Sequence, residues 1–364
     1  MSDIRIDRAF LPEVAAVIGG GFGSEGKGLI VSRIFHQYQH HVRVGAANAG
    51  HTGYFPAGDE KRLKVLSQQL PMAAWMANEF NLFCYIGPGA VISKDILLRE
   101  IAESRIEPRR LFIDQRAHVI TEKQIEDEAN SDLKERIGST STTAREGIGT
   151  ATADRVMRSA ECSLVHSLEN RELHPYVADV PARLSAARSI LLEGTQGSGL
   201  SLTTGFFPYT TSRNTTAAGL LADSGVAPMR LQRCIGVFRT FPIRVAGNSG
   251  PFYPDSECTS FEDIGVSPEF TTVTKLRRRI ATWSDLQLRE AVRINGFSEL
   301  AITFMDYVSP NIAGVDASLA EDDMAADPKY DEVIEFLDNV YAELPNGVDV
   351  TYLGTGPDSV IHLD

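Results

Sequence analysis

Short apolar runs alternate along the chain with segments in which apolar residues recur every three or four positions. Runs of the first kind indicate buried strands, and the periodic segments indicate helices that bury one face. The predicted strands are 13–18, 41–45, 83–86, 111–114, 189–193, 235–239, 299–305 and 349–353. The predicted helices include 27–38, 94–104, 121–136, 154–168, 285–294 and 329–343. This alternation predicts an α/β fold with a central, mainly parallel β-sheet flanked by helices.

No internal repeat, low-complexity segment or domain boundary interrupts this pattern. We therefore expect one large domain over residues 1–364, a length that suffices for a sizeable core. Glycine- and Ser/Thr-rich stretches at 138–152 and 194–216 are typical of binding loops, and the acidic stretch 321–327 of a solvated surface loop.

The balance of charges bears on whether the partner is a nucleic acid or a small molecule. The chain has 35 basic and 48 acidic residues and a net charge of −13. A nucleic-acid polymer needs a basic face, so the balance argues against such a partner. Small anionic substrates remain possible where basic residues gather, as in Arg277-Arg278-Arg279. A triplet of this kind is otherwise most often a solvated edge.

Cysteine and hydropathy patterns indicate a cytoplasmic protein. The four cysteines, Cys84, Cys162, Cys234 and Cys258, form no C-x-x-C pair and no zinc pattern with the eight histidines. Buried free thiols in a reducing compartment are the expectation. No run approaches the roughly 20 apolar residues that span a bilayer, and charges precede the first apolar run, so we expect neither a membrane segment nor a signal peptide.

A phosphate-binding turn follows the first predicted strand. The apolar residues 14–18 lead into Gly-Phe-Gly-Ser-Glu-Gly-Lys-Gly at 21–28. In such a turn backbone N–H groups face an anion, glycines permit close approach, and the lysine adds a charge. Gly21 to Lys27 fits G-x-x-x-x-G-K, but Gly28 stands where that motif has the Ser or Thr that binds Mg²⁺. The turn thus predicts nucleotide chemistry with different metal ligands.

Two other interpretations of the turn exist. Gly21, Gly23 and Gly26 also match G-x-G-x-x-G, the fingerprint of a dinucleotide-binding dehydrogenase. That fold needs an acidic residue after the next strand, and residues 45–48 contain none. A glycine-rich turn without any ligand is the other interpretation.

Further polar motifs set the turn in context. They are Asn48-Ala49-Gly50-His51-Thr52, Gly194-Thr195-Gln196-Gly197, Tyr209-Thr210-Thr211-Ser212-Arg213-Asn214-Thr215-Thr216 and Thr274-Lys275-Leu276-Arg277-Arg278-Arg279. With the turn, and in this order, they resemble the signatures of adenylosuccinate synthetase from about Val14 to Asp358. The resemblance implies a carbon–nitrogen ligase of purine biosynthesis that uses Mg²⁺. A nucleoside triphosphate phosphorylates O6 of a purine nucleoside monophosphate, and the amine of L-aspartate displaces that phosphate.

The resemblance also assigns residues to each ligand. The catalytic residues would be Ser24, Lys27, His51 as general acid, and Gln196 at the purine O6. Those for the triphosphate would be Gly23, Glu25, Gly26, Lys27, Gly28, His51, Thr52, Asp306, Gly354, Gly356 and Pro357. Those for the monophosphate would be Ser24, Asn48, Thr140, Arg158, Gln196 and Thr211, with Thr140 favoured within an expanded loop at 138–143. Those for aspartate would be Thr274, Arg277 and Arg279, and those for the metal Ser24 and Gly50. Arg158 matches an arginine that the family shares across a dimer interface, which implies a homodimer.

Ser24 is the main departure from the family. An Asp at this position is the family's base at N1 of the purine and a ligand of Mg²⁺, and a serine has no carboxylate for either task. One interpretation is an inactive homologue. The other concerns shape, because losing bulk and negative charge beside N1 and C2 admits a 2-amino group. The sequence looks like a viral branch that carries this kind of replacement and joins dGMP to aspartate to make a 2-aminoadenine precursor, which would place the protein in the host cytoplasm.

The donor base is a second departure. The family reads guanine with Thr-Lys-x-Asp, whereas this chain has Thr303-Phe304-Met305-Asp306. A phenylalanine offers a stacking face without a guanine-specific contact, so we expect relaxed donor use or a preference for ATP or dATP. An ordinary synthetase that tolerates Ser24 and uses IMP and GTP remains an alternative, as do a non-catalytic nucleotide-binding switch and GMP in place of dGMP.

Overall fold

A computed structural model describes residues 10–11, 13–58, 61–133, 146–270 and 275–364. Two of the predicted site residues, Thr140 and Thr274, lie outside these ranges.

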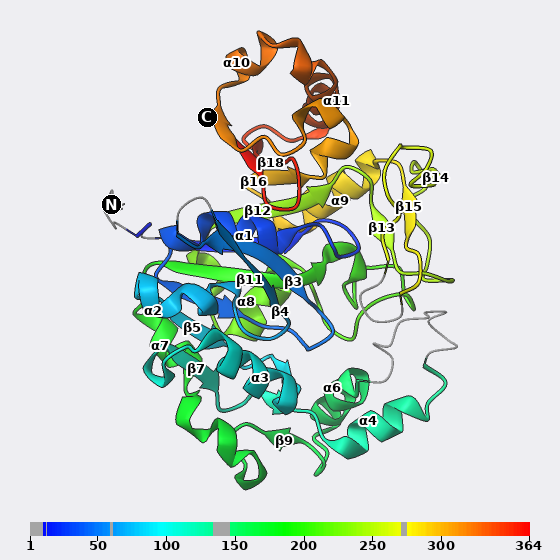
Figure 1. Cartoon of the computed structure of the whole chain (residues 1–364). Coiled ribbons are helices and arrows are strands. Elements are labelled where there is room, and N and C mark those ends of the chain that lie inside the picture. The colour runs from blue at the N-terminus through cyan, green and yellow to red at the C-terminus, as the bar shows by residue number, and fades with distance from the viewer. Residues whose placement is uncertain (1–9, 12, 59–60, 134–145, 271–274) are drawn as a thin grey trace.

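An eleven-stranded sheet, counted over the described ranges, forms the centre of the molecule (Figure 1). Most neighbouring strands are parallel, and only the β18–β19 pair is antiparallel. In spatial order the strands are β10 (Val177–Ala178), β7 (Leu111–Asp114), β5 (Phe83–Ile86), β2 (His40–Arg43), β11 (Ile190–Gly197), β1 (Val14–Gly19), β12 (Leu231–Arg239), β16 (Glu299–Thr303), β18 (Asp349–Gly354), β19 (Val360–Leu363) and β17 (Ala317–Leu319).

Three small sheets surround the large one. They are a hairpin of β3 (His51–Pro56) and β4 (Arg62–Ser67), a sheet of β6 (Val91–Ile92), β8 (His118–Val119) and β9 (Ser163–Leu164), and a sheet of β13 (Ile243–Arg244), β15 (Arg279–Ala281) and β14 (Cys258–Thr259). In Figure 1 the last of these stands at one side of the molecule, beyond the ends of the central strands.

Helices connect the strands. The α-helices are α1 (Lys27–Ile34), α2 (Ala77–Phe80), α3 (Lys94–Ser104), α4 (Glu122–Ala129), α6 (Ile148–Met157), α7 (Val180–Ser185), α8 (Ala217–Ser224), α9 (Asp285–Asn295), α10 (Glu321–Ala325) and α11 (Asp331–Glu343). The 3₁₀-helices are η1 (Phe35–Gln37), η2 (Met72–Met76), η3 (Pro108–Arg110), η5 (Leu168–Tyr176), η6 (Ser198–Leu200), η7 (Pro228–Arg230), η8 (Met305–Tyr307), η9 (Pro310–Ile312) and η10 (Pro328–Tyr330).

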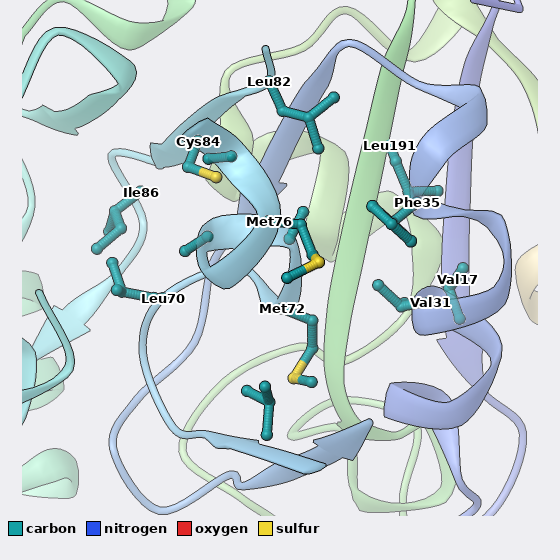
Figure 2. Close-up of a cluster of buried hydrophobic side chains, with 14 of the residues drawn as sticks. Val17, Val31, Phe35, Leu70, Met72, Met76, Leu82, Cys84, Ile86 and Leu191 are labelled. Atoms are coloured by element: carbon teal, nitrogen blue, oxygen red, sulfur yellow. The ribbon is translucent and has the colours of Figure 1, made fainter. Parts of the chain in front are cut away.

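The central strand β1 contributes to two hydrophobic cores, one on each face of the sheet. Ala15 and Val17 belong to the core that α1, η2 and α3 cover, whereas Val14, Ala16 and Ile18 belong to the core under α7, α8, α9 and α11. Successive strand residues point to opposite faces, which explains this division. Figure 2 shows side chains of the first core, among them Val31 of α1, Phe35 of η1, Leu191 of β11 and Val17 of β1. Burial on both faces explains why the β1 sequence is apolar throughout.

The α/β architecture and all eight predicted strands are confirmed, but several predicted helices differ in extent. The predicted helix 154–168 is wrong: α6 begins at Ile148, after Gly147 (φ 74°), and ends at Met157, before Arg158 takes a left-handed conformation (φ 55°). The structured start of α6 also shortens the loop expected at 138–152. A capping box at Thr121 begins α4, which ends at Ala129 within the predicted span 121–136.

Smaller corrections concern the ends of elements and two surface features. The predicted helix 27–38 ends at Ile34 and continues as η1, and β16 ends at Thr303 because Phe304 is left-handed (φ 61°). The acidic stretch expected to be a loop contains α10. Cys84 and Cys234 are buried, but Cys162 is half-buried and Cys258 exposed, and all four are free thiols. Within the described ranges, no helix has the length and apolar character to cross a membrane.

Candidate active site

The glycine-rich turn lies at the carboxyl end of β1, between its neighbours β11 and β12. Open α/β sheets bind ligands at such a point, where connections leave the central strand in opposite directions. Gly26 is left-handed (φ 83°) and precedes Lys27, the first residue of α1. A side chain at Gly28 would place its Cβ 2.3 Å from the Thr52 carbonyl oxygen of β3. Close packing of the hairpin on α1 therefore explains why glycine replaces the Ser or Thr of other phosphate-binding loops.

Glu25 occupies the donors of this turn. Its Oε1 accepts hydrogen bonds from the backbone N–H of Gly21 at 3.2 Å and of Gly23 at 2.6 Å. Its Oε2 lies 2.7 Å from Nζ of Lys27, and both side chains are buried. The groups that the sequence predicts for phosphate are thus paired with a carboxylate of the same turn. A bound phosphate would have to compete with Glu25 for them.

A buried cluster orients His51. Glu193 and Arg43 stand directly opposite each other in the register of β11 and β2. Nδ1 of His51 lies 2.6 Å from Oε1 of Glu193, and Nη1 of Arg43 donates to the same oxygen at 2.5 Å. The second Glu193 oxygen accepts the backbone N–H of Met72 at 2.9 Å. We call His51, Glu193 and Arg43 the His51 cluster.

The His51 cluster sets the charge states of His51 and Glu193 and leaves one nitrogen of His51 without a partner. Burial, followed by the charge of Arg43, lowers the pKa of His51 to about 4, so the imidazole is neutral near pH 7. Burial would raise the pKa of Glu193, but Arg43 and His51 lower it to about 2. With Nδ1 bound to Glu193, the buried Nε2 of His51 has no hydrogen-bond partner in the described part of the chain. Buried polar atoms are normally paired, so this nitrogen is positioned for a ligand.

The residues predicted for the monophosphate nucleotide come together around Gln196. Its Nε2 donates to Oγ1 of Thr211 at 3.1 Å and to Oδ1 of Asn48 at 3.4 Å. Its Oε1 is buried without a partner among the described residues. Gln196 is also left-handed (φ 58°), a conformation that costs a non-glycine residue about 1–2 kcal/mol. Strain and an unpaired atom both mark this residue as a ligand-binding candidate.

Ser24 lies in a cationic corner. It is exposed and left-handed (φ 59°), its Oγ accepts a hydrogen bond from Nη1 of Arg278 at 2.9 Å, and its carbonyl oxygen lies 3.5 Å from Nη1 of Arg239. Arg239 pairs with Glu269, and its guanidinium stacks on the Phe304 ring, 3.8 Å from the centroid. We call Ser24, Arg278, Arg239, Glu269 and Phe304 the Ser24 cluster. The carboxylate of this cluster, Glu269, pairs with Arg239, and among the described residues the Ser24 hydroxyl has a guanidinium as its partner.

The two arginines predicted to bind aspartate, Arg277 and Arg279, have other partners than Arg278 has. Arg277 is exposed and pairs with Glu262, whereas Nη1 of Arg279 donates to the Gly250 carbonyl oxygen at 2.7 Å. All three arginines line one cavity of about 390 Å³, together with residues 258–262. The cavity supplies the positive charge that a dicarboxylate would need.

The predicted donor-base residues gather beside the turn. Oγ1 of Thr303 donates to the Glu25 carbonyl oxygen at 2.7 Å, so the end of β16 is bound to the turn. Asp306 follows in η8; its Oδ1 is buried without a partner in the described ranges, and burial raises its pKa. Gly354 ends β18, and the loop after it holds Gly356 and Pro357. This loop is fixed by Arg33 of α1, whose Nη2 donates to the Asp358 carbonyl oxygen.

The hydrogen bond of Arg158 is to its own helix, α6, and not to the other predicted site residues. Arg158 is exposed at the end of α6, where its Nη1 lies 3.4 Å from the Val156 carbonyl oxygen. Val156 and Met157 beside it are 67% and 76% exposed.

Sequence reasoning missed Glu193, Arg43, Arg239 and Glu269. Three of them carried a detectable signal, because Arg43, Glu193 and Arg239 are each the one charged residue within or at the end of a predicted strand. A charge in such a strand is costly unless it is paired, and two of them predict a partner pair. No comparable signal points to Glu269, which lies in an irregular loop.

The sheet, the glycine-rich turn on its central strand, and the buried histidine beside that turn define a nucleotide-binding α/β enzyme. Comparison with known proteins identifies the family. The family model for adenylosuccinate synthetase matches residues 16–178 and 163–346. The chain is 34% identical over 350 residues to the adenylosuccinate synthetase of Archaeoglobus fulgidus, covering 94% of this chain and 95% of that protein. It is 33% identical over 357 residues to the enzyme of a Pyrococcus species, with the same coverage.

Solved structures agree. Cyanophage S-2L succinoaminodeoxyadenylate synthetase (PurZ), bound to dGMP and to dATP as an energy donor, has a TM-score of 0.77 and 32% identity over 96% of this chain and 95% of that one. Fully ligated adenylosuccinate synthetase from Plasmodium falciparum has a TM-score of 0.79 at 19% identity, over 96% and 99% of the two chains, and bears on the fold alone. The chain belongs to the adenylosuccinate synthetase family and is a carbon–nitrogen ligase of purine biosynthesis.

Proposed function

We propose that this ligase joins dGMP to L-aspartate, with ATP or dATP as donor, to form 2-amino-2′-deoxy-N6-succinoadenylate, ADP or dADP, and phosphate. The observation that carries the proposal is Ser24 in the turn where the family has Asp, contacted by a guanidinium and not by a substitute carboxylate. The cyanophage relative, whose solved structure holds dGMP and dATP, supports this specificity.

Ser24 would select the purine by shape and charge. A carboxylate at this position would crowd an exocyclic amine at C2, while a hydroxyl is smaller and carries no charge. Gln196 would donate its amide N–H to the purine O6, where charge develops as the phosphoryl group arrives; Nε2, which donates to Thr211 and Asn48 in the ligand-free protein, would have to turn toward O6 because the unpaired Oε1 can only accept. The phosphate of the nucleotide would bind nearby, with Thr140 and the partner's Arg158 completing the set.

His51 would act on the donor triphosphate. An acid at the β–γ bridging oxygen needs a proton on Nε2, and burial with Arg43 disfavours that proton in the ligand-free protein. The negative charge of a bound triphosphate would raise the pKa of His51 and favour protonation. Glu193 holds Nδ1, so Nε2 would be the atom that faces the phosphates. Lys27 and the N–H groups of the turn would bind the same phosphates once Glu25 releases them.

The residues fit a Mg²⁺ ion that is held mainly by substrates. The described residues contain no group of three or more His, Cys, Asp or Glu side chains able to hold a metal. The Ser24 hydroxyl already accepts from Arg278, which makes it a poor ligand, so the carbonyl of Gly50 would be the main protein donor. Bound there, Mg²⁺ would neutralise charge on the phosphate oxygens, whose hard character it prefers.

Arginines would bind the aspartate carboxylates, as Arg277 and Arg279 line the cavity of about 390 Å³ and Thr274 precedes them. The donor base would stack on Phe304, whose ring makes no guanine-specific hydrogen bond. We place the reaction in the cytoplasm, of a virus-infected host if the chain is viral.

A homodimer would complete the site through Arg158. The exposed Val156 and Met157 beside it form an apolar edge that a second copy would cover. Sedimentation should give a dimer for the wild type and a monomer for Met157→Asp. A wild-type monomer that is fully active would contradict shared sites.

The deciding experiment measures phosphate release with aspartate and Mg²⁺ while dGMP, GMP and IMP are crossed against ATP, dATP and GTP. Turnover with dGMP and an adenine donor supports the proposal, and turnover confined to IMP and GTP contradicts it. The latter result would identify an ordinary adenylosuccinate synthetase, the second candidate, which the archaeal relatives favour. Nucleotide binding without turnover in any combination would indicate a non-catalytic protein.

A further inference from the structure

We propose that Arg278 is a specificity-determining residue for the purine, because it fixes the Ser24 hydroxyl as an acceptor for the 2-amino group. This inference rests on the proposed use of dGMP and deepens it. Aspartate binding was expected from Arg277 and Arg279, and neither of them contacts Ser24.

The backbone and side chain of Arg278 hold its guanidinium in place. Its backbone N–H donates to the Glu269 carbonyl oxygen at 2.9 Å, and its Nε lies 3.4 Å from the Phe270 carbonyl oxygen. From this position Nη1 donates to Oγ of Ser24 at 2.9 Å. One guanidinium therefore connects the loop after Glu269 to the glycine-rich turn.

The charge of the Arg278 guanidinium strengthens its hydrogen bond to Ser24. Arg239 pairs with the carboxylate of Glu269, which also accepts from the Tyr307 hydroxyl at 3.3 Å. Burial would raise the pKa of Glu269, but the charges of Arg239 and then of Arg278 lower it, so Arg278 lies within electrostatic reach of this pair. Burial lowers the pKa of Arg278, although its guanidinium remains the charged form near pH 7. A charged donor makes the stronger kind of hydrogen bond and restrains the hydroxyl that accepts it.

The Ser24 hydroxyl keeps one site at which it can accept a further hydrogen bond. A serine oxygen has two acceptor lone pairs and one O–H donor. Arg278 occupies one lone pair, and the left-handed backbone of Ser24 fixes the direction of Cβ. The other lone pair is open to an N–H of the ligand. A 2-amino group would fill it, whereas hydrogen at C2 would leave it unpaired.

The site would discriminate against purines without a 2-amino group, because they would leave the Ser24 oxygen without a second hydrogen-bond partner. Sites built to hydrogen-bond a substrate group reject analogues that lack it, because a polar atom of the site is then buried without a partner. Without Arg278 the hydroxyl would rotate toward other partners or water, and the penalty for the 2-hydrogen analogue would shrink. We expect Arg278→Gln to lower the preference for a 2-amino purine about tenfold.

The test compares dGMP with dIMP, which differ only in the 2-amino group. For each, kcat/KM is measured at saturating donor, and the KM of aspartate is measured separately. Wild type should prefer dGMP, and Arg278→Gln should lower that preference about tenfold. Arg277→Gln is the matched control from the same triplet: it should raise the KM of aspartate and leave the dGMP-to-dIMP ratio unchanged.

A double-mutant cycle locates the effect. If Arg278 acts through Ser24, Arg278→Gln should leave the ratio unchanged in a Ser24→Ala background. Should Arg278→Gln lose turnover entirely, the ratio of dGMP and dIMP dissociation constants from calorimetry, without aspartate, replaces the kinetic ratio, and Arg278→Lys serves as the conservative variant. An unchanged ratio in Arg278→Gln with a wild type that prefers dGMP would overturn the role of Arg278. A wild type without that preference would instead overturn the proposed function.

Discussion

The His51 cluster and the Ser24 cluster lie around one glycine-rich turn but are built in opposite ways. All three side chains are buried: Glu193 and Arg43 lie opposite each other on the adjacent strands β11 and β2 of the central sheet, and His51 begins β3 of the hairpin. The Ser24 cluster draws its members from loops and strand ends, and Ser24 is exposed. Two strands of the central sheet thus support His51, while loops and strand ends surround Ser24, the residue that departs from the family.

This difference separates chemistry from specificity. A change in the His51 cluster leaves a charge unpaired in the core, so it affects folding and turnover together. Ser24 itself is exposed, so a change there meets solvent and should alter ligand choice at a small cost in stability, although Arg239 of the same cluster is buried. Substrate preference can therefore diverge within the family while the acid stays in place.

The largest expected effect comes from Glu193→Gln. It leaves Arg43 buried without an ionised partner, which costs about 3–5 kcal/mol of the free energy of unfolding, and it releases Nδ1 of His51. Turnover of the folded variant should fall about 100-fold or more. Chemical denaturation and kcat measure the two losses. Glu299→Gln is the control, since it breaks the Arg233 pair at the start of β16: stability should fall while kcat stays near wild type.

Ser24→Asp should produce the next largest effect. The new carboxylate would pair with Arg278 and crowd the 2-amino group, so the ratio of kcat/KM for dGMP over IMP should fall about 100-fold. Stability should change by less than about 1 kcal/mol because the side chain is exposed. Kinetics with both substrates tests this. Improved dGMP turnover would contradict the shape argument.

Acidification should destabilise the protein through the His51 cluster. Burial lowers the pKa values of His51 and of the neighbouring His41 to about 4. Because the unfolded chain binds these protons from about pH 6.5 downward, stability falls as pH drops from 6.5 to 4. Each histidine should contribute a loss of about 2 kcal/mol between pH 7 and 5. Urea unfolding of wild type and His51→Gln at both pH values should show a shallower dependence in the variant.

Phe304→Leu should have the smallest effect. It removes the ring under Arg239, a contact worth about 1 kcal/mol, and the stacking face proposed for the donor base. The KM of ATP should rise a few-fold while the dGMP-to-IMP ratio stays constant. A large change in that ratio would mean that donor and acceptor specificity are not separable within the Ser24 cluster.

The sequence allowed eight strands of the central sheet to be predicted, because burial on both faces leaves an apolar run that few alternatives explain; the outer strands β10, β17 and β19 were missed. The family resemblance, and not the strand pattern, grouped Asn48, Gln196 and Thr211, and the structure brings them into contact. The α6 boundaries were missed because Gly147 and Arg158, both left-handed, set them by backbone conformation and not by periodicity. The Glu269 contacts depend on how irregular loops fold back, which no local pattern encodes.

Three non-glycine residues at the site, Ser24, Gln196 and Phe304, hold left-handed backbones at or just after strand ends. Each stores about 1–3 kcal/mol of strain that glycine would relieve. A search for thermostable variants would therefore be drawn to these positions and would remove side chains to which we assign ligand binding. Stability and activity compete at the same three positions, so a robust version of this ligase must gain its stability elsewhere in the chain.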